Sequence, residues 1–498
     1  MASTLSLPPY NFIFINFFSF TLFFLFLIKK SKIIRKKNFF FFYGWLFGFG
    51  FFITNLYWIS ISLSFDENFK FLIPLTIFLL PAFLALFYGF ISYFFIIFKT
   101  KNIVGSFFIF SLIFGIIEFL RSFILTGFPW NLVVYSFSNQ LEFISVTSIL
   151  GTYGLNLFCI SLFTCPALFI MRESRIDTTV GIIFILIALS FFVHGTYYKK
   201  KFDNLDKETF GFKIRVIGSN ISLERFYSDV EPINIIEDLI DISDPDFEKK
   251  TIFVWPEGIL PDISQNDLAD FDWLFKKHFN RNHLLIIGIN SKLKNEFTTK
   301  YYNSLSIYDH QLNLINSYNK INLVPFGEFL PYENILKKIG LKTLTNNYQS
   351  FSKGDKRKIV DINANNIKLK ILPLICYEII YSGKLFNDNN FDLIMNISED
   401  GWFGESEGPI QHFNHSIFRA IESGKYIVRS SNNGSAAIIN PTGFVEKQVN
   451  FGEKGYVDLE EKRKIKPTIF SKYGNKIFGL LILLYISLIF SFNKFKND

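Results

Sequence analysis

The stretch ILPLICYEII, residues 371–380, decides the fold of the central part of the chain. Its first half has the length and the isoleucine and leucine content of a buried β-strand. Cys376 comes at the end of this run, and Tyr377 and Glu378 follow before the chain becomes apolar again. The end of a buried strand is where a scaffold can hold a side chain rigidly over a cleft, so Cys376 is a candidate functional residue.

The cysteine content sets Cys376 apart, because the chain has only three cysteines in 498 residues. Cys159 and Cys165 lie within an apolar block, where we expect inert core residues. Cys376 has no partner in the more polar middle of the chain, so no disulfide framework is expected there.

Other short apolar runs surround this stretch and alternate with segments of helical spacing. The strand-like runs are FKIRVIGSN (212–220), TIFVWPE (251–257), HLLIIGIN (283–290), LKILPLICYE (369–378) and FDLIMNIS (391–398). The segments of helical spacing are PINIIEDLIDI (232–242) and IQHFNHSIFRAIESGKY (410–426). This alternation predicts an α/β or layered α+β domain.

Long apolar blocks flank this domain, and half of all residues are hydrophobic. We assign seven spans, each near the length of about 20 residues that crosses a bilayer core: 10–28, 39–64, 71–98, 103–124, 146–170, 178–195 and 475–492. We therefore expect an N-terminal transmembrane bundle of about six spans over 1–199, a domain over 200–466, and a C-terminal transmembrane helix with a cytoplasmic tail over 467–498.

Basic residues gather in short clusters beside the spans and give the chain its net charge of +8. The clusters are KKSKIIRKK (29–37), KTKN (99–102), RESR (172–175) and NKFKND (493–498). Placing all four in the cytoplasm gives one consistent topology, with the domain on the other side of the membrane. Such clustering indicates membrane topology and not nucleic-acid binding.

The same topology puts the N-terminus outside, where MASTLSLPPYNF (1–12) is typical of a loop between helices. One hypothesis is that a further N-terminal span is missing from this chain. A cleaved signal peptide is the weaker interpretation, because no small-residue cleavage site follows the first apolar block.

Three polar residues at or near strand ends have the parts of an activated nucleophile: Glu257, Lys320 and Cys376. A thiolate is the reactive form of cysteine, a carboxylate can take the thiol proton, and an ammonium can stabilise the charge on an attacked carbonyl oxygen. Each residue alone is more often structural: an inert cysteine, a turn carboxylate or a solvated lysine. The three are far apart in the sequence, so only the fold can bring them together.

The segments that carry these residues, WPEG, NKINLVPFGEFLP and ICYEI, resemble the Glu-Lys-Cys triad of the nitrilase (carbon–nitrogen hydrolase) superfamily. The match is closest to its membrane-anchored members, the apolipoprotein N-acyltransferase family. Further segments that resemble this family are EFLRSFILTGFPW (118–130), DGWFGESEGPIQHF (400–413), RAIES (419–423) and RSSNNGSAAIINPTG (429–443). The resemblance implies a polytopic α-helical membrane bundle that carries an αββα sandwich domain.

By this resemblance, Cys376 is the nucleophile, Glu257 the general base and Lys320 the residue that stabilises the oxyanion, with the backbone N–H of Tyr377 as a second donor. Glu328 matches a further carboxylate near the lysine. Tyr377 and Glu378 match residues that the family needs for activity, and we expect Glu378 to fix the turn after Cys376.

The resemblance also implies the reaction and its partners. An acyl chain would pass from a membrane phospholipid, usually phosphatidylethanolamine, through a cysteine thioester to the α-amine of a diacylglyceryl-cysteine lipoprotein. We expect a monomer without cofactor or metal, in the bacterial inner membrane, with the catalytic domain on the periplasmic side.

Three departures from the family pattern lie outside the triad, and the expected loss of one N-terminal span is one of them. Phe226 stands where the family usually has a tryptophan near a lid over the site. Glu399 replaces an asparagine of the family, so it could alter loop contacts or head-group preference.

Other polar residues have structural interpretations beside functional ones. His412 and His415 have a spacing that can bind a metal, but we favour structural hydrogen bonds. Glu118 and Arg121 lie one turn apart inside an apolar span, where ionisable residues are usually paired. For them a structural pair and a contact with a lipid head group stay open.

Two other function classes compete with acyl transfer. A membrane-tethered amidase would use the same triad and deliver its thioester to water. A transporter or receptor would only bind lipid, but ionisable residues are scarce in the spans and the triad is intact.

Overall fold

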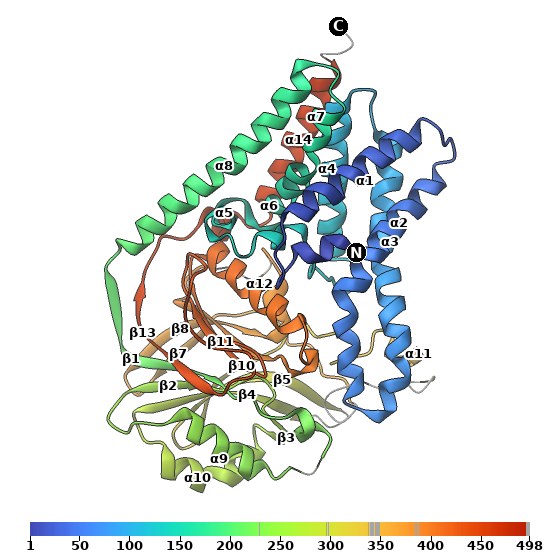
Figure 1. The fold of residues 1–498 in the computed structure, drawn as a ribbon. Helices are drawn as coiled ribbons and strands as arrows, with labels where there is room; N and C mark the ends of the chain where they lie inside the picture. Colours follow the sequence, from blue (N-terminus) through green and yellow to red (C-terminus); the bar gives the residue numbers. More distant parts are fainter. Residues whose placement is uncertain are drawn as a thin grey trace.

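A computed structural model shows two parts, a helical bundle and an α/β domain below it (Figure 1). It describes residues 1–228, 230–294, 296, 298–336, 338, 343, 349–383, 385 and 388–494. Of the C-terminal basic cluster, 495–498 lie outside the described residues.

Seven helices among the described residues are long and apolar enough to cross a membrane, the number that the sequence predicts. The bundle helices are α1 (Phe14–Ser31), α2 (Asn38–Leu56), α3 (Ile73–Phe98), α4 (Ile103–Arg121), α5 (Leu141–Ile144), α6 (Thr147–Thr164), α7 (Pro166–Ile170) and α8 (Arg175–Asp203), with α14 (Lys476–Lys494) from the C-terminal end. Short 3₁₀ helices extend two of the spans, to Asn38–Ser64 and Glu67–Phe98. The first predicted span begins four residues too early, because the chain turns through Asn11 at a positive φ of 55° before α1 begins.

Helices α4 and α6 form the centre of the bundle, since most of their residues are buried, whereas α3, α8 and α14 are largely exposed. The outer helices expose large apolar side chains such as Leu480 and Leu483, which suits contact with acyl chains. Helices α2 and α3 pack closely through Gly44 and Gly48, where an added Cβ would lie within 2.6 Å of Tyr88. This is the small-residue contact by which membrane helices approach one another.

The domain is built on one sheet of thirteen strands, whose main path runs β6-β5-β4-β2-β1-β10-β9-β8-β7. The strands are β1 (Lys207–Gly218), β2 (Thr251–Val254), β3 (Leu260–Ser264), β4 (His283–Lys294), β5 (Thr299–Asp309), β6 (Leu314–Asn319), β7 (Val360–Ala364), β8 (Ile367–Ile375), β9 (Leu393–Glu399), β10 (Tyr426–Asn432), β11 (Ala436–Ile439), β12 (Val445–Val449) and β13 (Gly455–Arg463). All five predicted strand runs are strands. The two halves of the sheet meet at a single parallel pair, Gly218 with Ser431.

The halves of the sheet face each other, and helices cover both outer faces (Figure 1). The domain helices are α9 (Pro232–Ser243), α10 (Asp272–His278), α11 (Glu333–Leu336), α12 (Gly408–Ser423) and α13 (Ile469–Tyr473). Strand β2 shows the alternation: Ile252 and Val254 point into the central core, while Phe253 packs in the outer core with α9 and α10. Helix α12 packs on the other half, so the predicted αββα sandwich is present.

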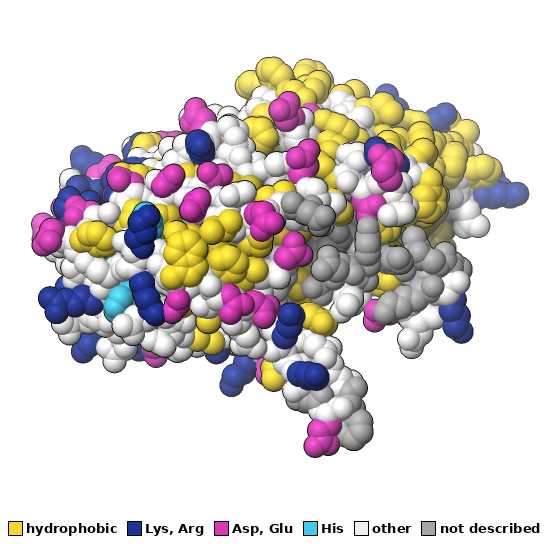
Figure 2. Space-filling model, turned by 90° about the horizontal axis from the view of Figure 1, so that it is seen from below, with side chains coloured by type: hydrophobic (Ala, Val, Ile, Leu, Met, Phe, Trp, Pro, Cys, Tyr) yellow, Lys and Arg dark blue, Asp and Glu magenta, His cyan; other side chains and the backbone are white. Residues whose placement is uncertain are grey.

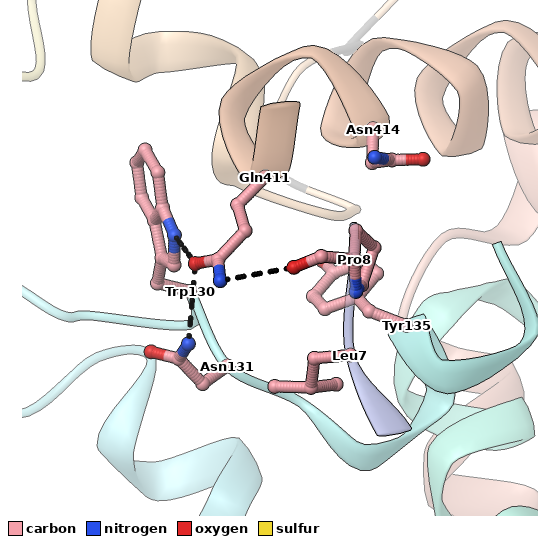
Figure 3. Close-up of a pocket in the computed structure, with 7 residues that line it drawn as sticks. All are labelled: Leu7, Pro8, Trp130, Asn131, Tyr135, Gln411 and Asn414. Carbon is pink, nitrogen blue, oxygen red and sulfur yellow. Dashed lines mark hydrogen bonds between the residues drawn. The ribbon is translucent and has the colours of Figure 1, made fainter. Parts of the chain in front are cut away.

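Helix α12 also joins the domain to the bundle. Figure 3 shows the side chain of Gln411, which accepts a hydrogen bond from the indole N–H of Trp130 at 2.9 Å and donates to the carbonyl oxygen of Pro8 at 3.3 Å. In the last turn of α12, Glu422 Oε1 accepts hydrogen bonds from the backbone N–H and the hydroxyl of Thr152 in α6. The domain face remote from the bundle instead mixes acidic and basic side chains, as Figure 2 shows.

The buried ion pair of Arg419 and Glu422 is expected to be essential for this joint. Both side chains are fully buried, with 2.8 Å between Arg419 Nε and Glu422 Oε2. Glu422→Ala leaves the guanidinium buried without its partner, which destabilises a protein by about 3–5 kcal/mol. We expect a clear fall in the unfolding temperature of the detergent-solubilised protein.

Asp272→Ala is the matched control, because it removes a carboxylate whose partner, Lys276, lies on the surface of α10. Surface pairs contribute little, so this variant should unfold like the wild type. Equal unfolding temperatures for the Glu422 variant and the wild type would contradict the stabilising role of the Arg419–Glu422 pair.

Candidate active site

Cys376 lies directly after β8, at the first position of a 3₁₀ helix, Cys376–Ile380. Its φ is +46°, a strained conformation for a residue with a side chain. Glu378 holds this turn: its Oε2 accepts the backbone N–H of Ile375 at 2.9 Å. This is the contact expected if Glu378 fixes the turn after Cys376.

Glu378 also ties the nucleophile turn to the segment that carries Lys320. Its other oxygen, Oε1, accepts the backbone N–H of Ile321 at 2.9 Å and the hydroxyl of Tyr318 at 2.9 Å, and it pairs with Arg357 at 3.0 Å. The carboxylate is fully buried. One side chain therefore sets the positions of two of the three candidate residues.

Lys320 places its ammonium between two carboxylates. Its Nζ lies 2.8 Å from Oε1 of Glu257 and 2.9 Å from Oε1 of Glu328. The amide of Asn303, in the neighbouring strand β5, donates to both carboxylates at 2.7 and 2.8 Å. All four side chains are buried, so the structure brings Glu257, Lys320 and Glu328 together as one cluster.

The charges of Glu257 and Lys320 both act on the pKa of the Cys376 thiol. Burial raises the pKa of Cys376 well above its ordinary value, the carboxylate of Glu257 raises it further, and the ammonium of Lys320 opposes both. Burial lowers the pKa of Lys320, but Glu257 and Glu328 outweigh it and keep the amine charged. Burial raises the pKa of Glu328 against the pull of Lys320. At neutral pH the resting site therefore holds a neutral thiol beside a charged ammonium.

Comparison with known proteins identifies the family to which the chain belongs. The family model "Apolipoprotein N-acyltransferase N-terminal domain" matches residues 1–165, and the model "Carbon-nitrogen hydrolase" matches residues 253–463. The apolipoprotein N-acyltransferase of Rickettsia prowazekii is 32% identical over 463 residues, which cover 90% of each chain. That of Rhizobium rhizogenes is 31% identical over 471 residues, 91% of this chain and 87% of the relative. The chain belongs to the apolipoprotein N-acyltransferase family.

Family membership makes the chain an acyltransferase of a bacterial membrane that acts in the N-acylation of lipoproteins. It argues against the transporter and receptor hypothesis. Among solved structures, an amidase of the nitrilase superfamily from Nesterenkonia sp. AN1 is similar over 50% of this chain and 91% of its own, with 13% identity and a TM-score of 0.34.

A second buried network reaches the backbone of Cys376, and the sequence did not reveal it. Asp400 accepts hydrogen bonds from Ser398 at 2.7 Å and from Arg429 at 2.6 Å. His412 lies between Asp400 Oδ1, 2.8 Å from its Nδ1, and the carbonyl oxygen of Cys376, 3.3 Å from its Nε2. The hydrogen-bonded role expected for His412 is thus present, and it reaches the backbone of the nucleophile.

His415 differs from its neighbour on α12. Its Nδ1 has no hydrogen-bond partner among the described residues. Its ring packs instead against Trp130 and Tyr135, with centroid distances of 5.2 and 4.6 Å. Among the described residues, the structural hydrogen bonding favoured for His415 is therefore not formed at Nδ1, where the bundle supplies aromatic rings instead.

Glu399, the acid in place of the family's asparagine, is neutralised by a partner from the chain itself. Its carboxylate pairs with the buried guanidinium of Arg225 and accepts the amide of Asn432 at 2.8 Å. Its backbone N–H donates to Oε2 of Glu257 at 3.0 Å. Arg225 precedes Phe226, so this pair joins the segment of the expected lid to the candidate carboxylate, Glu257.

Phe226 lies near the site without entering the cluster. Its ring is half-buried and packs against Trp402 with a centroid distance of 5.0 Å. A Cβ added to Gly258, the residue after Glu257, would lie 3.9 Å from the Phe226 ring. The aromatic residue therefore stands beside the strand end that carries Glu257.

The loop after α4 brings the membrane bundle to the residues that follow Cys376. Tyr377 donates its hydroxyl to the carbonyl oxygen of Gly127 at 3.0 Å, and Tyr381 donates to that of Thr126 at 3.0 Å. Arg121 donates to the next carbonyl, that of Phe128, and pairs with Glu118. Both side chains of this pair are 1% exposed, which favours the structural interpretation over a contact with lipid head groups.

Gly288 in β4 makes room for Glu257, the candidate general base. An added Cβ would lie 2.3 Å from the carbonyl oxygen of Pro256 and 2.5 Å from Cα of Glu257. We expect Gly288→Ala to displace Glu257 and to slow acylation of Cys376 about 100-fold, because a misplacement of about 1 Å can cost that much. Gly479→Ala in α14, where the added Cβ meets nothing, is the control. Equal acylation rates for the two variants would refute this role of Gly288.

The pH dependence of thiol alkylation tests the electrostatics of the cluster. Since the pKa of Cys376 is raised, its thiolate appears only at alkaline pH, and alkylation by iodoacetamide should rise there with a midpoint above that of a free cysteine. Glu257→Gln removes a negative charge that raises this pKa, so the midpoint should fall. Mass spectrometry of Cys376 over a pH series measures it. An unchanged midpoint in Glu257→Gln would mean that Glu257 does not act on the thiol.

Proposed function

We propose that the chain transfers an acyl chain from a membrane phospholipid, through a thioester on Cys376, to the α-amine of a diacylglyceryl-cysteine lipoprotein. The observation that carries this proposal is the cluster of Glu257 and Lys320 around the buried thiol of Cys376. The loop after α4 supports it further, since it brings the membrane part of the chain within one hydrogen bond of the residue beside the nucleophile.

The first half-reaction forms the thioester. Glu257 accepts the thiol proton, and the thiolate attacks the ester carbonyl carbon of the phospholipid. Lys320 and the backbone N–H of Tyr377 stabilise the negative oxygen of the tetrahedral intermediate. The ester C–O bond then breaks, and the proton on Glu257 passes to the leaving glycerol oxygen, which gives a lysophospholipid.

The second half-reaction uses the same groups in reverse. The lipoprotein amine attacks the thioester carbonyl, and Glu257 accepts a proton from that amine. The C–S bond breaks, and the proton returns to sulfur, so an amide is formed and the thiol is regenerated. These steps need no cofactor or metal.

The supporting residues act by position. Glu328 and Asn303 hold Lys320 and Glu257 in place, and Glu378 holds the turn that presents the thiol. We propose that Phe226, beside Trp402, belongs to a lid over the acyl chain. Phosphatidylethanolamine is the proposed donor, and the active protein is proposed to be a monomer.

The catalytic domain is proposed to lie on the periplasmic side of the inner membrane. The connections that carry the basic clusters, between α1 and α2, between α3 and α4, and between α7 and α8, lie at the end of the bundle remote from the domain (Figure 1). Positively charged connections favour the cytoplasmic side. This arrangement supports a domain outside the cytoplasm.

Acyl-enzyme trapping tests the proposal. The detergent-solubilised protein is incubated without acceptor with phosphatidylethanolamine that carries a labelled acyl chain, and then quenched in acid. We expect a hydroxylamine-sensitive label on Cys376 by mass spectrometry and none in Cys376→Ala. Absence of label in folded wild-type protein would overturn the thioester.

The acceptor step separates the two enzyme hypotheses. Addition of a diacylglyceryl peptide with a free α-amine should move the label from Cys376 to the peptide. A peptide whose amine is acetylated is the matched control and should leave the label in place. Release of the label as free acid, at the same rate with either peptide, would favour the membrane-tethered amidase.

A further inference from the structure

A basic pocket of about 220 Å³ opens at the opposite end of the parallel strands from Cys376. Cys376 follows the carboxyl end of β8, whereas this pocket is lined by residues at the beginnings of β9 and β10 and at the end of β13. Its charged lining consists of Lys370, Lys425, Lys462, Arg463 and Lys464, with Asp392 as the one carboxylate. The pocket lining thus contains five basic side chains and one acidic side chain.

The positive charge of this basic pocket is only partly neutralised. Lys462 takes the single carboxylate, with 2.8 Å between its Nζ and Oδ1 of Asp392. Lys425 donates to the carbonyl oxygen of Phe391, and burial and then the charges of Lys462 and Lys464 lower the pKa of Lys425 against the pull of Asp392.

The two exposed lysines of the pocket lack strong partners. Lys464 forms no ion pair within the part of the chain that the structure describes. Lys370 has its carboxylate partner, Asp361, 3.9 Å away on the protein surface. The pocket is therefore suited to an anion.

The basic pocket lies beside both connections between the domain and the membrane. Arg463 donates to the carbonyl oxygen of Leu205, just after α8, and its guanidinium lies 5.6 Å from the ring of Phe202 in the last turn of that helix. On the other side, Ile465 and Pro467 line the pocket and lead into α13 and α14.

The length of α8 places these connections at the level of the lipid head groups. Its 29 residues measure about 43 Å, more than the core thickness of about 30 Å. Its apolar part ends near Val193, and the remaining residues read HGTYYKKKFD (194–203). Tyrosine and lysine at a helix end are typical of the membrane–water interface, so the pocket beside Phe202 faces the head-group layer.

We propose that this basic pocket binds the phosphate of an anionic phospholipid, such as phosphatidylglycerol, in the leaflet on the domain side. Lysines suit this ligand, because they act on phosphate as point charges. A zwitterionic phospholipid is disfavoured, since its ammonium would meet the uncompensated cations. The pocket is therefore a second lipid site, separate from acyl transfer and selective for a different head group from that of the proposed donor.

The test compares Lys370→Gln/Lys464→Gln with Lys276→Gln/Lys277→Gln. Both pairs are exposed and change the net charge equally, but the second pair lies on α10, remote from the bundle (Figure 1). Native mass spectrometry of the full chain in micelles measures binding of phosphatidylglycerol and phosphatidylethanolamine. We expect the wild type to prefer phosphatidylglycerol, and the pocket variant to bind it about 30-fold more weakly, from about 1 kcal/mol for each lysine. The control should bind like the wild type.

Three outcomes would overturn the proposal: equal weakening in both variants, no preference for phosphatidylglycerol, or inorganic phosphate that displaces the lipid at comparable concentration, which would indicate a site for free anions. Labelling of Cys376 from phosphatidylethanolamine alone, measured in the same variants, should be unchanged. That readout separates failure of this proposal from failure of the proposed acyl transfer.

Discussion

The buried ammonium of Lys320 is the interaction on which the rest of the site depends. A charge without water must be paired, and this one is shared between Glu257 and Glu328 while Asn303 donates to both carboxylates. Asn303 lies in β5, and the charged residues lie in the segments after β2 and β6. The pairing therefore holds these segments of one half-sheet together. Glu378 then connects that half to the other through Ile321 and Ile375.

Cys376, the proposed nucleophile, is held by contacts before, at and after its own backbone, which explains how a strained conformation persists there. Glu378 holds the N–H before it, His412 approaches its carbonyl oxygen, and Tyr377 after it reaches the loop of the bundle at Gly127. Strain of this kind survives only where the surroundings over-determine it. The membrane part of the chain thus contacts the site directly and does more than anchor the domain.

Much of this could be predicted from the sequence. The seven spans follow from apolar length, and the strand runs of β1, β2, β4, β8 and β9 follow from buried Ile, Leu and Val. Strands β5, β6 and β12 could not be found this way, because their alternating or exposed residues give no apolar run. Glu257, Lys320 and Cys376 could be named, but the network of Asp400, Ser398 and Arg429 could not, because buried polar partners are set by tertiary contacts. The pairing of Arg225 with Glu399 joins positions 174 residues apart and left no local signal.

The pairing of β1 with β13 has a consequence for how the protein is made. Arg215 in β1 binds Asp458 in β13, 243 residues later in the chain. The first half-sheet therefore cannot be completed until nearly all of the domain has left the ribosome, shortly before α14 is synthesised. Until then, the edge of β1 that pairs with β13 stays open, while the six candidate spans before β1 are already made. An open strand edge is prone to misassociation. Biogenesis of this protein thus demands that the newly made domain be protected while it waits for its last strand.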